Sequence, residues 1–194
     1  MGIVKTLRQS TLPFIDLSSR QTFIANMMFM HGLMVASEDL IDVALSTNRC
    51  ELPLIEYFTT HREEERDHAQ WLRDDLESVG ITIPRVHWQA ASIAGTQYYL
   101  IKHVSPHALI GYMAALEHKP MPLVTVAELE KRYGKSLLRT VRYHSEHDID
   151  HTRDLLAFVR SASFLDMPLI TETTTKTLEA ITSVASTWRR ASNA

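Results

Sequence analysis

Two segments of the chain repeat one spacing of ligand-capable side chains: a histidine, a carboxylate four positions later, and a second histidine three positions after that. The residues are His61, Glu65 and His68 in the first triad, and His144, Asp148 and His151 in the second. An α-helix turns about 100° per residue, so these offsets bring the three side chains of a triad within an arc of roughly 60°. The sequence therefore predicts two helices, each with three potential ligands on one face.

The rest of the chain is typical of an all-α protein. Only 6 glycines and 7 prolines occur among 194 residues, and no segment alternates convincingly between apolar and polar residues as a strand would. Apolar residues at helical spacing predict helices over about 19–47, 53–79, 87–102, 106–118, 125–133 and 135–159, with a last helix after Asp166. The methionine-rich stretch 27–34 is apolar nearly all round and is expected to pack in the core. We expect one all-α domain over residues 1–194, a bundle of about six or seven helices.

The charge and cysteine content exclude several classes of function. A formal net charge of −3 leaves no basic surplus for binding nucleic acid or an anionic membrane. No apolar run is long enough to span a bilayer, and the N-terminus lacks a signal-peptide core. The only cysteine, Cys50, excludes an internal disulfide and a thiolate metal cluster. We expect a cytoplasmic protein whose partner is a small-molecule substrate. A homodimer is compatible with a helical protein of this size, but no stretch identifies an interface.

The donor types of the triads favour a pair of redox metals. Imidazole and carboxylate ligands without thiolates suit iron, manganese or zinc. A structural zinc ion uses four protein ligands and a catalytic one about three, whereas two facing triads offer six. Two donor sets joined by carboxylates fit two Fe(II) ions, with manganese as a second option. Iron held in this way activates dioxygen, which would be the co-substrate.

Three segments resemble the heme-oxygenase-like diiron oxidases, a family that shares its helical fold with heme oxygenase and with the TenA and PqqC proteins. The segments are 143–152 around the second triad, 64–76 around His68, and 111–117, which ends in Glu117. The resemblance implies a heme-oxygenase-like bundle. It also implies a set of metal ligands consisting of His68, Glu117, His144, Asp148 and His151.

The carboxylate of the first ligand helix departs from the family pattern. Many members place a glutamate seven residues before the histidine, where this chain has His61. Glu65, Glu64 or His61 itself could fill the role, and we favour Glu65 with His61 as an additional ligand. The resemblance further implies activities such as oxidative fragmentation of amino acids, decarboxylation of fatty acids and N-oxygenation. Nothing in the sequence identifies the substrate.

Other interpretations use many of the same residues. A ferritin-like iron-handling protein would use Glu38, Glu65 with His68, Glu117, and Asp148 with His151, but it leaves His144 without a role. A metal-free TenA- or PqqC-like enzyme or binding protein would use the histidines and carboxylates as acid–base or substrate-binding groups. Heme oxygenase itself requires a proximal histidine, and residues 7–17 contain none. Either triad alone could be an ordinary polar helix face, but both together with Glu117 favour a metal site.

Overall fold

The computed structural model describes residues 3–9, 17, 19–161 and 166–192, and these residues form nine α-helices, one 3-10 helix and no strand. The α-helices are α1 (Ile3–Gln9), α2 (Arg20–Ser46), α3 (Leu52–Glu64), α4 (His68–Glu77), α5 (Trp88–His103), α6 (Ala108–Glu117), α7 (Leu123–Tyr133), α8 (Arg139–Ser161) and α9 (Met167–Ser192). The 3-10 helix η1 (Ser136–Leu138) leads directly into α8. The prediction of an all-α fold is confirmed.

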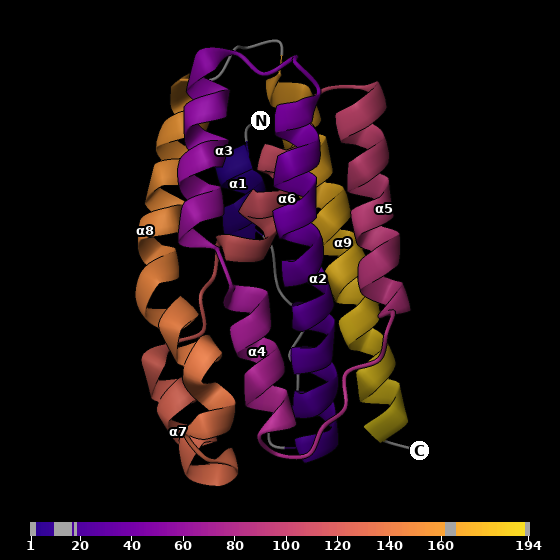
Figure 1. Cartoon of the computed structure of the whole chain (residues 1–194), viewed down its shortest axis with the longest axis vertical. Helices are drawn as coiled ribbons and strands as arrows, with labels where there is room; N and C mark the ends of the chain where they lie inside the picture. Colours follow the sequence, from indigo (N-terminus) through magenta and orange to yellow (C-terminus); the bar gives the residue numbers. More distant parts are fainter. Residues whose placement is uncertain (1–2, 10–16, 18, 162–165, 193–194) are drawn as a thin grey trace.

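The long helices run side by side in an elongated bundle (Figure 1). Helices α3 and α4 follow one another along the bundle, with α2 on one side of them and α8 on the other. Helix α5 packs against the outer side of α2, and α9 lies behind. None of the described helices combines the length and the apolar character that crossing a membrane requires.

Helix α6 lies in the centre of the bundle and fixes the position of Glu117. Eight of its ten residues are buried, because nearly every position of this helix is apolar. It packs closely on α9, and a Cβ added at Gly111 would lie 2.4 Å from the carbonyl oxygen of Ile170. Only glycine allows this approach. Glu117, the last residue of α6, is thereby held between α3 and α8.

The structure corrects the helix that was expected over residues 53–79. It forms two helices, α3 and α4, because the chain leaves helical geometry over residues 65–67. Asp67 has φ 66° and ψ 0°, the left-handed region that aspartate tolerates better than most residues. This break and the unexpected helix α1 explain why the described residues contain nine α-helices rather than six or seven. Most of the segment 7–17, where heme oxygenase would need its proximal histidine, lies outside the described residues.

Candidate metal centre

The structure brings predicted ligands together in two groups of three. The first donor group consists of His61, Glu117 and His151, and the second donor group consists of Glu65, His68 and His144. Within each group, one potential ligand atom from every residue lies within 4.8 Å of the others. Ligands at about 2.0–2.2 Å from a single ion are at most about 4.4 Å apart, so each group is close to the size of one metal site.

Each sequence triad contributes to both donor groups. Seven residues of α-helix rise about 10.5 Å, which is too far for one ion to contact both ends of a triad. In α8, His144 belongs to the second group and His151 to the first. On the other side, His61 at the end of α3 belongs to the first group, and His68 at the start of α4 to the second. The two triads therefore face each other in opposite order along the chain, with His61 beside His151 and His68 beside His144.

Two carboxylates lie between the groups. The Oε2 atom of Glu65 is 3.0 Å from Nδ1 of His68, and its Oε1 atom is 3.4 Å from Nδ1 of His151. Asp148 lies outside both three-donor groups, but its Oδ1 is 2.9 Å from Nδ1 of His144 and 3.9 Å from Nδ1 of His151. A carboxylate whose oxygens face two donor groups has the position of a bridging ligand in a two-metal site.

The three candidates for the first-helix ligand differ in burial and in the groups they approach. The Glu65 side chain is 16% exposed and faces both groups, whereas the Glu64 side chain is 46% exposed and approaches only His151, at 3.6 Å. His61 is buried, and its Nε2 lies 3.3 Å from Oε1 of Glu117. This arrangement supports Glu65 as the carboxylate and His61 as an additional ligand, with Glu64 at the rim.

Charges within the centre shift its pKa values strongly. Burial by itself would lower the pKa of His61, but the negative charge of Glu117 and the hydrogen bond to it raise this pKa to about 9. Burial would raise the pKa of Glu65, but a hydrogen bond from His68 and the positive charge of His144 lower it to about 2. Near neutral pH, Glu65 thus stays ionised and His61 carries a proton. A divalent cation would replace the proton on His61, because histidine coordinates metal only in its neutral form.

Several buried atoms of the centre have no hydrogen-bond partner. They are Oε2 of Glu117, Nε2 of His144 and Nδ1 of His151. An unsatisfied buried polar group typically costs about 1–3 kcal/mol. All three atoms belong to residues of the donor groups, and metal coordination would remove their cost. The donor set and its unsatisfied atoms therefore fit a pair of metal ions.

A cavity of about 300 Å³ opens beside both donor groups. Its walls are mainly apolar and come from α2, α4, α6, α8 and α9. They include Met30, Leu33, Met34, Ile41, Leu72, Leu109 and Met113. Met27 is buried in the core as expected, whereas Met30 and Met34 line the cavity, which the sequence pattern could not distinguish from core packing. Glu38 also lines the cavity but belongs to neither donor group.

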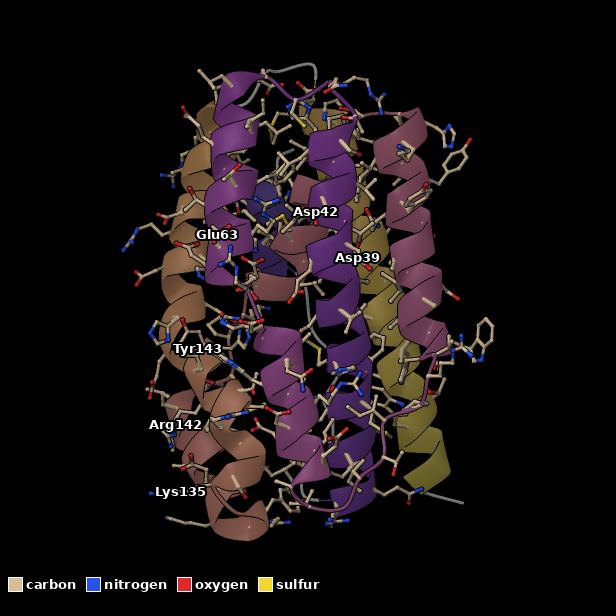
Figure 2. All side chains as sticks on the ribbon, viewed as in Figure 1. Asp39, Asp42, Glu63, Lys135, Arg142 and Tyr143 are labelled. Atoms are coloured by element: carbon tan, nitrogen blue, oxygen red, sulfur yellow. The ribbon has the colours of Figure 1, made fainter. Side chains whose placement is uncertain are left out.

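Aromatic residues that sequence reasoning did not assign surround the second donor group. The ring of His68 has its centroid 4.5 Å from that of Trp71 and 4.8 Å from that of Tyr143. Figure 2 shows Tyr143 on α8, at the level where α3 gives way to α4. Their spacing from the histidines is a sequence signal: Trp71 follows His68 by three positions, and Tyr143 directly precedes His144.

Comparison with known proteins establishes the fold alone. No protein-family model matches the sequence, and no curated protein matches it. The structure is similar to the crystal structure of a domain of unknown function with a heme oxygenase-like fold from Shewanella denitrificans OS217, with a TM-score of 0.68 and 13% sequence identity. The similarity covers 98% of this chain and 90% of that one. The chain therefore has the heme-oxygenase-like fold expected from its sequence.

Proposed function

We propose that the protein is a non-heme diiron oxidase or oxygenase that uses dioxygen to oxidise a small organic substrate. One observation carries the proposal: two adjacent three-donor groups, joined by the Glu65 carboxylate, border an apolar cavity. When bound, two Fe(II) ions would supply the electrons that activate dioxygen. Manganese suits the same donors.

The residues of the centre have distinct tasks in this proposal. His61, Glu117 and His151 hold one ion, and Glu65, His68 and His144 hold the other. Glu65 keeps the two ions together because its oxygens face both groups. Asp148 orients His144 through the 2.9 Å contact with its Nδ1, as carboxylates commonly orient metal-bound imidazoles, and it is a further candidate ligand.

The cavity sets limits on the substrate. A volume of about 300 Å³ is at the small end of the range for ligand pockets. Its methionine and leucine walls would hold an apolar body and exclude water from the reacting atoms. The basic side chain among its described lining residues is Lys119. These features suit a small amino-acid or fatty-acid type of molecule.

A metal-free enzyme or binding protein, like TenA or PqqC, is the second candidate. It is favoured by the close pairs of His68 with Glu65, at 3.0 Å, and of His144 with Asp148, at 2.9 Å, which resemble acid–base pairs. A ferritin-like iron-handling role would instead require Glu38 as a ligand. In that case Glu38→Ala would lower the iron content, whereas our proposal expects it to leave iron loading intact.

The deciding experiment measures metal content and the reaction with dioxygen. Tag-free protein is loaded anaerobically with Fe(II), assayed for bound iron, and mixed rapidly with oxygenated buffer while its absorption is recorded. We expect about two irons per chain and a transient absorbing species. Glu64→Gln, which alters the exposed neighbour of Glu65, is the matched control and should behave as the unaltered protein. Iron at background level would overturn the proposal in favour of the metal-free candidate.

A further inference from the structure

Three aromatic rings are in mutual contact at the second donor group. The His68 ring lies 4.5 Å from that of Trp71 and 4.8 Å from that of Tyr143, measured between centroids. The rings of Trp71 and Tyr143 are 5.3 Å apart at an interplanar angle of 83°. These separations are those of aromatic rings in direct contact. A candidate metal ligand therefore touches both of the side-chain types that lose a single electron most readily.

The same cluster reaches the surface. His68 is 1% exposed, whereas Trp71 and Tyr143 are half-buried. Tyr143 stacks on His147, with centroids 4.1 Å apart and an interplanar angle of 17°, and His147 is exposed to solvent. The position of Tyr143 on the flank of α8 can be followed in Figure 2. A continuous series of rings thus connects the interior of the centre with water.

The first donor group has a different aromatic neighbour, which makes an internal comparison possible. Tyr57 stacks on the ring of His61 at 5.9 Å. It then packs on Phe158 at 5.1 Å and on Phe58 at 6.0 Å, neither of which is readily oxidised. Its hydroxyl is buried and has no hydrogen-bond partner, so a departing phenolic proton has no acceptor there. Tyr57 touches the centre, but its buried hydroxyl has no group to take its proton.

We propose that Trp71 and Tyr143 form an electron relay between the metal centre and the protein surface. The inference rests on the proposed diiron function. If dioxygen reacted at bound iron while the cavity held no substrate, an oxidising equivalent would remain there. Trp71 or Tyr143 would then give one electron inward through His68. An oxidised Trp71 would in turn take an electron from Tyr143, whose ring is 5.3 Å away. Because tunnelling weakens steeply with distance, rings in contact provide the fastest path.

Tyr143 must also lose and regain a proton, and it must regain the electron that it gave. Oxidised Tyr143 releases its phenolic proton to water and becomes a neutral radical. A one-electron reductant in solution, of the ascorbate or thiol class, reaches the half-buried ring from the surface and returns one electron. Water then supplies one proton, and the tyrosine is restored. The relay thereby protects the ligands from oxidation when turnover fails.

The test detects the radical rather than product. Protein loaded with Fe(II) is mixed with dioxygen without substrate or reductant, frozen within a second, and examined by electron paramagnetic resonance. We expect an organic radical that falls at least about tenfold in the double variant Trp71→Phe with Tyr143→Phe. Tyr57→Phe is the matched control and should leave the signal unchanged. Peptide mass spectrometry should place oxidation products at Trp71 and Tyr143 in the unaltered protein.

Iron content and dioxygen consumption are measured on the same samples, so the two proposals can fail separately. No bound iron overturns the diiron function and the relay with it. Bound iron and dioxygen consumption without a radical overturn the relay alone, as does a radical that persists in the double variant. Unaltered protein grown with ring-deuterated tyrosine provides a check that needs no substitution. If the radical is on Tyr143, its electron paramagnetic resonance signal should narrow. The relay would be overturned if the line shape of the signal stays the same and mass spectrometry finds no oxidation of Trp71.

Discussion

The segment from α3 to α4 and helix α8 carry the same triad spacing but position it on different backbones. In α8 the helix is continuous through His144, Asp148 and His151. Between His61 and His68 the helix ends, and the chain turns through Asp67 before starting again. Both arrangements deliver one histidine to each donor group. The difference lies in the carboxylates.

The break allows the Glu65 carboxylate to approach histidines of both donor groups, which Asp148 does less closely. On α8, Oδ1 of Asp148 lies 2.9 Å from Nδ1 of His144, one turn away. The same oxygen is 3.9 Å from Nδ1 of His151, which is 1.0 Å farther. Glu65 is the cap residue at the end of α3, and its two oxygens lie 3.0 and 3.4 Å from histidines of opposite groups. On the continuous helix the Asp148 carboxylate lies closer to one histidine, whereas at the break the two oxygens of Glu65 each approach a different histidine.

The largest effect is therefore expected from the bridging position. Glu65→Gln keeps the shape of the side chain but removes its charge, so under our proposal both ions would lose a charged ligand. We expect iron affinity to fall by about 100-fold or more, since disturbing even an outer partner of a metal ligand costs about 10–100-fold. Glu64→Gln should stay close to the unaltered protein. Equal losses in the two variants, measured by iron titration, would remove Glu65 from the bridging position.

Single histidine variants should separate the two donor groups. His151→Ala removes a first-group ligand from the continuous helix, and His61→Ala removes one from the broken segment. Both should leave about one iron or less per chain, because each group would hold one ion under our proposal. His68→Ala should do the same through the second group. If His151→Ala retains the full metal content measured by elemental analysis, His151 is not a ligand.

The left-handed residue at the break should matter for stability. Asp67→Val forces a β-branched residue to φ 66° and should cost about 1–2 kcal/mol of unfolding free energy. Asp67→Gly should be close to neutral, because glycine adopts this conformation freely. The comparison is made by urea denaturation of metal-free protein. Equal midpoints for the two variants would contradict a left-handed residue at this position.

The smallest expected difference compares exposed positions in the two segments. Glu146→Gly introduces glycine inside α8 and should destabilise by roughly 1 kcal/mol. Arg66 lies between α3 and α4, outside both helices, so Arg66→Gly does not place glycine in a helix. This variant should change the free energy of unfolding by less than about 0.5 kcal/mol. Thermal unfolding of the two variants side by side measures this difference. A larger loss for Arg66→Gly would indicate that the break is not a helix boundary in solution.

Much of the helical architecture could be predicted because its signals are local. Helical periodicity and few glycines and prolines indicated α2, α5, α6, α7 and α8 within a few residues of their ends. Helix α1 was missed because its seven residues are too few for periodicity to be distinctive. The break at Asp67 was missed because aspartate in a charged run gives no strong stop signal, unlike glycine or proline.

The sequence by itself determined that His144, Asp148 and His151 share one helix face, because their spacing matches the helical repeat. It did not determine how these side chains are distributed between the two donor groups. His61 lies with Glu117, and Glu65 lies with His68 and His144, because α3, α4, α6 and α8 pack against one another. Side chains from four helices meet only after the bundle has packed, with Gly111 allowing α6 to approach α9. Local spacing can place ligands on a helix face, but only tertiary packing decides which faces meet.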